Sequence, residues 1–110
     1  MENITFDEFK KLDLRVGEII SVDDIPGADK VYKVIVNIGS EQRELVAGIK
    51  AHYPKEALVG KKIVVLTNLE PRTIRGVTSH GMLLAASNED KSLLAILTLE
   101  KDMPGGSKIS

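Results

Sequence analysis

The 110-residue sequence has no cysteine and no tryptophan, and only four aromatic residues. Without cysteine there are no disulfides, thiolate metal sites or thiol nucleophiles. This absence fits a reducing compartment, and we expect a cytoplasmic protein. The apolar runs are too short to span a bilayer, and the acidic, amphipathic start of the chain does not resemble a signal peptide. The sequence therefore predicts neither a secreted disulfide scaffold nor a protein that acts at a membrane.

The net charge is only −1, which argues against a uniformly basic surface for nucleic acid. The charges are nevertheless unevenly distributed along the chain. Residues 1–29 hold eight acidic and three basic side chains, whereas residues 50–81 hold six basic and two acidic ones. Such a chain can present a basic face while it remains neutral overall, unless folding interleaves the two segments.

Composition and length indicate one globular unit. With 43% hydrophobic and 28% charged residues, the chain can build a core and cover it. We find no internal repeat, low-complexity segment or linker, and we expect a single domain over residues 1–110.

Short β-branched segments separated by turns dominate the chain. Thr5 and Glu8 have the spacing of a capping box, which predicts a helix over about 6–11. Strands are predicted at 14–22, 31–38, 43–47, 62–66, 82–86 and 93–99, with a helical turn at 54–58. Gly17 indicates a bulge or bend in the first strand. Residues 71–76 are predicted to form a polar loop.

The order of these elements indicates the fold class. Three strands, a helical turn and further strands are typical of an oligonucleotide/oligosaccharide-binding barrel, or OB-fold. Strands so close in sequence favour antiparallel pairing, and closure into a barrel removes exposed edges. We therefore expect an all-β protein, a small five- to six-stranded OB-fold barrel with a short N-terminal helix. Periodicity alone leaves a small sandwich open.

Ser79 and His80 are adjacent, which raises the question of nucleophilic catalysis. Adjacent side chains of an extended chain point to opposite faces, so His80 is poorly placed to act as a base for Ser79. The sequence has no G-x-S-x-G elbow, no H-E-x-x-H pattern and no complete phosphate-binding loop. Nothing indicates an enzyme, and neither a metal ion nor an organic cofactor is implied.

A binding role suits a barrel without catalytic residues. The four aromatic residues, Phe6, Phe9, Tyr32 and Tyr53, supply few platforms on which bases or sugars could stack. This makes an oligosaccharide or a sequence-tolerant single-strand site a poor match. A structured RNA, contacted through phosphates, sugars and a few exposed bases, fits the composition better.

Six blocks of the sequence resemble, in order, the motifs of the tRNA-binding domain family. They are FKKLDLRVGEI at 9–19, PGADKVY at 26–32, LVAGI at 45–49, YPKEALVGK at 53–61, VLTNLEP at 65–71 and RGVTSHGMLLAA at 75–86. This family includes the C-terminal domain of methionyl-tRNA synthetase and free-standing tRNA-binding proteins. The chain departs from the family pattern at Ile25, where a histidine is usual, and at Glu70, where a basic or neutral residue is frequent.

The resemblance implies a barrel that binds tRNA without strict sequence choice, and Lys30, Ser79 and Met82 match positions of the family's RNA face. We expect RNA contacts from seven residues of the loop and strand-end regions: Lys30, Asn68, Arg72, Arg75, Ser79, His80 and Met82. Simpler roles stay open for four of them: Ser79 could cap the loop, Met82 could belong to the core, Asn68 could end a strand and Lys30 could pair with Asp29.

The resemblance also implies partners. Family members are often homodimers joined through the chain ends, and an apolar cluster of Ile4, Phe6 and Phe9 is too large to bury in a small barrel, so we expect these residues at a dimer interface. The chain is too short to hold the catalytic domain of methionyl-tRNA synthetase, so at most it is a non-catalytic β subunit that partners the catalytic one. The alternative is a chaperone-like protein-interaction barrel of the same fold.

Overall fold

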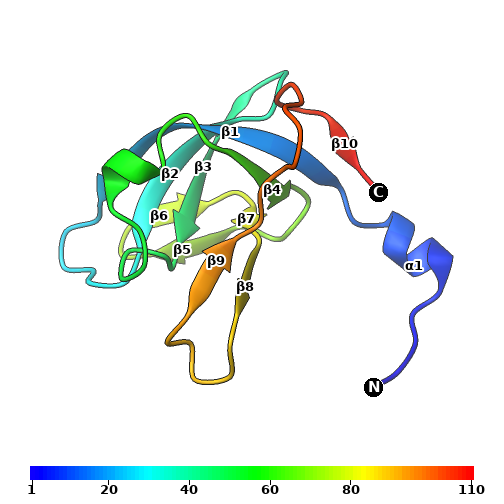
Figure 1. Cartoon of the computed structure of the whole chain (residues 1–110), viewed down its shortest axis with the longest axis horizontal. Helices are drawn as coiled ribbons and strands as arrows, with labels where there is room; N and C mark the ends of the chain where they lie inside the picture. The colour runs from blue at the N-terminus through cyan, green and yellow to red at the C-terminus, as the bar shows by residue number, and fades with distance from the viewer.

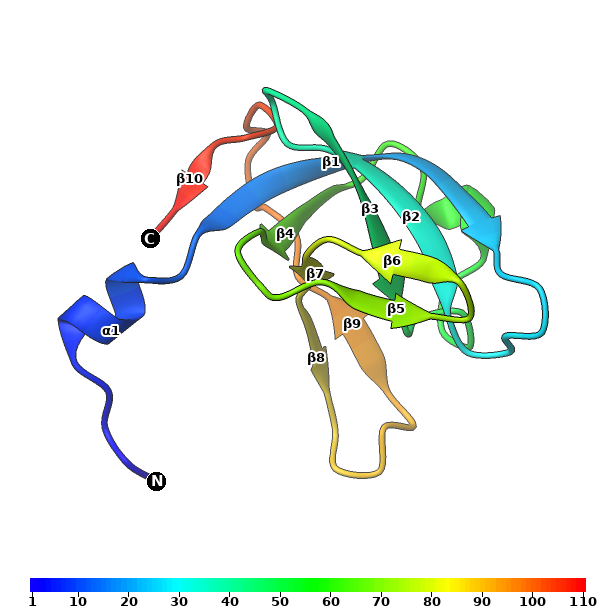
Figure 2. The same cartoon turned by 180° about the vertical axis from the view of Figure 1, so that it is seen from behind.

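Most of the strands form one strongly curved sheet (Figures 1 and 2). The structure, a computed structural model, describes all of residues 1–110. Its elements are α1 (Phe6–Lys10), β1 (Leu14–Asp24), β2 (Tyr32–Asn37), β3 (Gln42–Ala47), the 3₁₀ turn η1 (Lys55–Ala57), β4 (Lys62–Leu66), β5 (Arg72–Ile74), β6 (Val77–Ser79), β7 (Met82–Leu83), β8 (Ala85–Ser87), β9 (Leu94–Ile96) and β10 (Lys108–Ile109). The sheet order is β3-β2-β1-β4-β7, with β10 also paired to β1. Neither helical segment is long and apolar enough to cross a membrane. The predicted OB-fold barrel is confirmed.

The N-terminal helix α1 begins as the sequence predicts. The Thr5 hydroxyl accepts a hydrogen bond from the Glu8 N–H, and the Glu8 carboxylate accepts one from the Thr5 N–H. Two of the N–H groups that a helix start leaves without partners are thereby satisfied. The helix projects from the barrel together with the chain before it (Figure 1).

Strand β1 organises the sheet because it pairs with three others. Its first half pairs with β4, its second half with β2, and its start also with β10. The register with β2 shifts between Ile19 and Ser21, so the bulge lies there and not at Gly17. Gly17 is needed instead for packing, because a Cβ at this position would lie 2.9 Å from Val65 Cγ2. The predicted bulge at Gly17 was therefore wrong in position.

The core follows the alternation of strand side chains. In β2, Tyr32, Val34 and Val36 are buried while the residues between them are partly exposed. Leu58, which follows η1, is fully buried and belongs to the same core cluster. Each such side chain stabilises the fold by about 1.5–3 kcal/mol relative to an exposed position.

The chain after β4 differs from the prediction in two places. Residues 71–76 are not a loop, because β5 pairs with β6 in a hairpin whose two-residue turn is Arg75-Gly76. Both turn residues have positive φ, 48° and 81°, as a type I′ turn requires. The single strand predicted at 82–86 is broken at Leu84, whose N–H bonds to Val64 and whose carbonyl accepts from Leu97. Beyond Leu84 the chain forms a second hairpin, β8–β9, that projects from the barrel (Figure 1).

Asp13 links both chain ends to the barrel. Its carboxylate accepts hydrogen bonds from the Thr67 hydroxyl, from Lys108 and from Arg15, and these lower the pKa of Asp13 to about 2, with Thr67 contributing most. The Asn68 side chain accepts from the Asp13 N–H and donates to the Lys11 carbonyl. The end of β4 therefore fixes the connection from α1 to β1.

We predict that Gly106→Ala destabilises the protein more than Gly60→Ala does. Both glycines have φ near 90°, but a Cβ at Gly106 would meet the Ile38 carbonyl oxygen at 2.4 Å, whereas a Cβ at Gly60 meets nothing within 4 Å. Gly60→Ala should cost about 1 kcal/mol for the backbone conformation alone, and Gly106→Ala about 2 kcal/mol or more. Urea unfolding measures both. Equal losses would show that the chain around Gly106 is not packed tightly against the β2–β3 turn.

Candidate nucleic-acid interface

Two loop regions, 25–31 and 67–81, meet on one side of the barrel (Figure 2). The second region contains the β5–β6 hairpin, with Arg75 at its tip. The Arg75 guanidinium packs against the first region, since a Cβ on Gly27 would lie 3.2 Å from one of its nitrogens. Lys30 follows Gly27 in the same loop and is exposed. The fold thus brings two of the predicted cations, 45 positions apart in the numbering, to neighbouring loops.

The cations of these loops are free of ion pairs. Seven of the 15 basic side chains are paired with carboxylates, and Lys30, Arg72 and Arg75 are not among them. Beside the first region folding does interleave the charges, because Lys55 and Lys50 both pair with Asp24 and lower the pKa of its carboxyl group. The basic excess of the middle segment is therefore partly cancelled, and its two arginines on the hairpin are left uncompensated.

Ser79 joins the hairpin to the barrel from inside. Its side chain is buried, with the residue 7% exposed, and its hydroxyl accepts a hydrogen bond from the Val46 N–H at 2.9 Å and donates one to the Gly81 carbonyl at 2.8 Å. The next residue, His80, donates its N–H to the Glu44 carbonyl at 2.8 Å. Because no strand pairs with this edge of β3, these bonds close the barrel. The Ser79 hydroxyl is thus engaged within the protein, and its contact with RNA stays a prediction.

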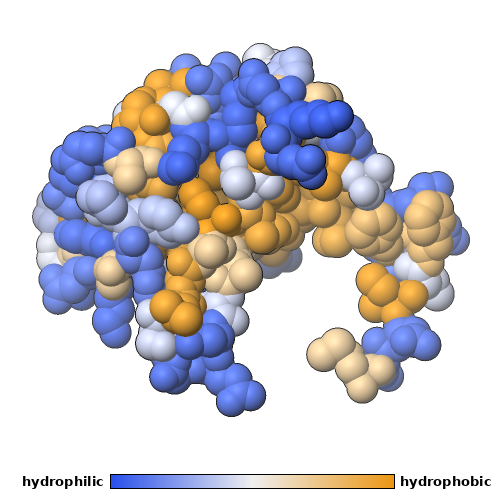
Figure 3. All heavy atoms as spheres, viewed as in Figure 1, coloured by the Kyte–Doolittle hydropathy of each residue, from blue (hydrophilic) through white to orange (hydrophobic).

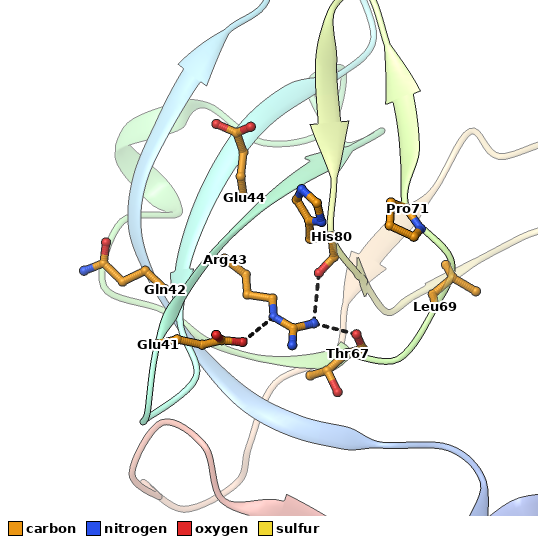
Figure 4. A pocket seen from close by; sticks show the side chains of 8 residues that line it. All are labelled: Glu41, Gln42, Arg43, Glu44, Thr67, Leu69, Pro71 and His80. Carbon is orange, nitrogen blue, oxygen red and sulfur yellow. Dashed lines mark hydrogen bonds and ion pairs between the residues drawn. The ribbon is translucent and has the colours of Figure 1, made fainter.

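Arg43 was not identified from the sequence. Its guanidinium donates to the Glu41 carboxylate at 2.7 Å and to the Thr67 carbonyl at 2.6 Å, and it reaches the His80 carbonyl at 3.4 Å (Figure 4). It joins β3 to both ends of the second loop region. The available signal was the i, i+2 spacing of Glu41, just before β3, and Arg43, within it, which places both side chains on one side of an extended chain.

The remaining predicted residues are Asn68, His80 and Met82, and all three are exposed. Asn68 is exposed, but its amide is engaged with the backbone near α1. His80 is exposed, and in Figure 4 its imidazole points away from the Arg43 guanidinium. Met82 is 40% exposed, at the rim of a hollow that Arg72 also lines. The face thus combines free cations, an exposed imidazole and an exposed thioether.

The geometry does not form a Ser–His pair. The Ser79 hydroxyl donates to the Gly81 carbonyl, and His80 contributes its backbone to barrel closure. The structure also places no group of three or more histidine, aspartate or glutamate side chains where they could hold a metal ion.

A small OB-fold barrel with free cations on its adjoining loops defines a class of binding module. Residues 14–108 match the family described as "Putative tRNA binding domain". The chain belongs to this tRNA-binding domain family.

Three relatives illustrate the likeness. The chain is 48% identical over 109 residues to methionine–tRNA ligase of Methanococcus maripaludis, which covers 99% of this chain and 16% of the ligase. The chain thus spans about one sixth of that relative. The crystal structure of a MetRS-related protein from Pyrococcus horikoshii superposes with a TM-score of 0.93 at 35% identity over the whole of both chains. The chaperone CsaA of Bacillus anthracis superposes with a TM-score of 0.89 at 26% identity, covering 99% of this chain and 100% of that one.

We predict that Ser79→Ala costs about 2 kcal/mol of folding stability, because it leaves the Val46 N–H and the Gly81 carbonyl without partners. The matched control is Ser87→Ala in β8, where the exposed hydroxyl makes no hydrogen bond within the protein, and it should be neutral. Urea unfolding of both variants measures the difference. A Ser79→Ala variant as stable as the control would mean that the hydroxyl does not close the barrel.

Proposed function

We propose that this protein binds structured tRNA through the face formed by loop 25–31 and residues 67–81, which include the β5–β6 hairpin, largely by backbone and shape. The proposal is carried by three exposed cations without ion pairs, Lys30 on loop 25–31 and Arg72 and Arg75 on the adjoining β5–β6 hairpin of a tRNA-binding domain. Phosphate contacts from such side chains release counterions and supply affinity with little dependence on sequence.

The other residues of the face have distinct proposed roles. His80 and Met82 are exposed and can touch sugar or base. The hydroxyls of Thr73 and Thr78, 3.0 Å apart on the outer face of the hairpin, can donate to phosphate or accept from a 2′-hydroxyl. Ser79 and Asn68 support this face through the hydrogen bonds that hold it.

We propose that residues 1–110 act as one domain without catalytic activity of its own, in the cytoplasm. Working as a free-standing protein or as the β subunit of methionyl-tRNA synthetase, it would raise tRNA affinity by holding the tRNA at a high local concentration beside the catalytic subunit. The support is the match to one sixth of a methionine–tRNA ligase together with a MetRS-related structure of equal length.

We also propose a homodimer joined through the chain ends. Helix α1 and β10 enclose an apolar groove of about 430 Å³ whose lining includes Phe6, Phe9, Leu12, Leu14 and Ile109. Phe6 is 71% exposed and Ile4 63% exposed. In the space-filling view, apolar side chains continue from α1 and the chain before it onto the adjoining barrel surface (Figure 3). An exposed apolar surface of this kind favours a protein contact.

Binding of polypeptides is a second candidate, favoured by the superposition on the chaperone CsaA. It leaves the three free cations of the loop face without a role, and we rank it below tRNA binding for that reason. An unfolded client protein that binds while tRNA does not would reverse this order.

We predict that the double variant Lys30→Ala, Arg75→Ala binds tRNA at least about tenfold more weakly and lowers the slope of log affinity against log salt by up to about 2, because two phosphate contacts are lost. Fluorescence anisotropy across a salt series measures both quantities. The control is Lys61→Ala, Lys101→Ala, which removes the same charge from exposed, unpaired lysines outside the two loops. Equal losses in the two variants would mean that only net charge matters.

We predict that Phe6→Ser shifts the protein from dimer to monomer at micromolar concentration while the fold is retained. Phe6 is largely exposed and lies outside the core cluster, so the change costs the monomer little. Val59→Ser, at another exposed apolar residue, 54% exposed beyond η1, is the control and should leave the dimer intact. Light scattering gives the mass of each. A wild-type protein that is monomeric would refute the proposed dimer.

A further inference from the structure

An apolar slot of about 290 Å³ opens beside Met82. One wall is residues 46–49, at the end of β3, and the other is residues 82–85 together with Leu94 of β9. Eight of its nine lining residues are hydrophobic, and the ninth is Gly48. The volume is at the lower limit for small-molecule pockets, which suits one planar ring system.

The rim of the slot is open to solvent while its floor belongs to the core. Met82 and Ala85 are exposed, whereas Ala47, Ile49 and Leu83 are buried and form part of the core cluster. The slot is therefore a preformed hollow whose floor is held rigidly by the barrel. A planar apolar ligand could enter from the rim without any core residue moving.

Gly48 supplies the polar groups of the slot. It follows β3 directly, is exposed, and its backbone N–H and carbonyl make no hydrogen bond within the protein. A Cβ built on Gly48 would meet nothing within 4 Å, so the space on the side where a side chain would point is free. One donor and one acceptor thus lie beside an apolar hollow, as needed to pair with the edge of a heterocyclic base.

Free positive charge lies on two sides of the slot. Arg72 lines the neighbouring hollow, which shares Val46 and Met82 with the slot. On the other side, the Lys30 carbonyl accepts a hydrogen bond from the N–H of Lys50, two residues after Gly48, so the Lys30 loop adjoins the slot. The hollow lined by Arg72 is also lined by the Glu70 carboxylate, but the two side chains do not form an ion pair. A ligand with a flat apolar centre and negatively charged flanks matches this arrangement.

We propose that the slot takes a single unstacked nucleobase of the bound RNA. The base would lie between Met82 and the end of β3, with its edge at the Gly48 backbone and its flanking phosphates near Arg72 and Lys30. Thioether and aliphatic contacts then take the place of the aromatic platforms that this chain lacks. This inference rests on the proposed binding of tRNA to the same face.

A peptide is the less favoured occupant because of how β3 is closed. An extended peptide binds a sheet edge through a row of backbone hydrogen bonds. On this edge the Glu44 carbonyl and the Val46 N–H are already taken by His80 and Ser79. These two bonds interrupt the row that an added strand would need, whereas one base needs only the two free backbone groups of Gly48.

Ala85→Leu tests the slot, and Ala86→Leu is its matched control. The two alanines are adjacent and exposed in β8 and point to opposite faces, and only Ala85 lines the slot. We expect Ala85→Leu to weaken binding of a tRNA transcript about tenfold, within the range for loss of one base contact. Its salt slope should equal that of the wild type, because no phosphate contact is removed. Ala86→Leu should stay within about twofold of the wild type.

Methyl NMR of the wild type supplies a second readout that needs no variant. The chain has three methionines, and with ¹³C-methyl labelling the Met82 signal should move upfield when tRNA is added, through the ring current of the base. The signals of Met1 and Met103, which do not line the slot, should not move in this way.

The outcomes separate the slot from the proposed function. Salt-dependent tRNA binding with an unmoved Met82 signal, and with equal affinities for the two leucine variants, would overturn the slot alone. A reduced salt slope in Ala85→Leu would also overturn it, since phosphate contacts would then be affected. Absence of tRNA binding by the wild type would overturn both proposals. A Met82 shift produced by an unfolded polypeptide and not by tRNA would assign the slot to peptides.

Discussion

The closure of the barrel at the outer edge of β3 is the constraint on which the rest of the structure depends. No strand pairs with this edge, and the gap is bridged by the Ser79 hydroxyl and the His80 N–H, with the Arg43 guanidinium beside them. Buried polar groups are costly without partners, so a few hydrogen bonds fix where the chain between β4 and β7 must lie. The β5–β6 hairpin is carried on that segment, and its tip consequently reaches Gly27 of the other loop region.

This placement explains how a nearly neutral chain can present a basic face. Electrostatic attraction to a polyanion depends on the local arrangement of charge more than on the sum. Asp24 pairs with Lys50 and Lys55, while Arg72 and Arg75 are left without carboxylate partners. Glu70 lines the hollow beside Arg72 without pairing with it. Five of the 16 acidic side chains are ion-paired, and none of them pairs with Lys30, Arg72 or Arg75.

The sequence was most informative where a local rule decides the structure. The capping box of Thr5 and Glu8, the alternation in 32–37 and the buried strand at 62–66 could all be predicted. The β5–β6 hairpin could not, because Arg at a positive φ replaces the Asn or Asp that marks a type I′ turn. The break at Leu84 depends on bonds to Val64 and Leu97, which are tertiary. Loop proximity and the Arg43 bridge likewise depend on contacts between segments distant in the chain.

The RGVTSHGM stretch at 75–82 therefore combines residues that hold the face with residues that are displayed on it. Ser79 is turned inward, and Gly81 has φ of 132° with no room for a Cβ, which would lie 2.8 Å from the Leu66 carbonyl oxygen. Because Gly81 packs closely against β4, the next side chain, Met82, lies at the rim of the slot. A substitution at Ser79 or Gly81 would disturb the fold of this face, because it removes hydrogen bonds or introduces a clash. Loss of binding therefore identifies a contact residue only when the variant is as stable as the wild type.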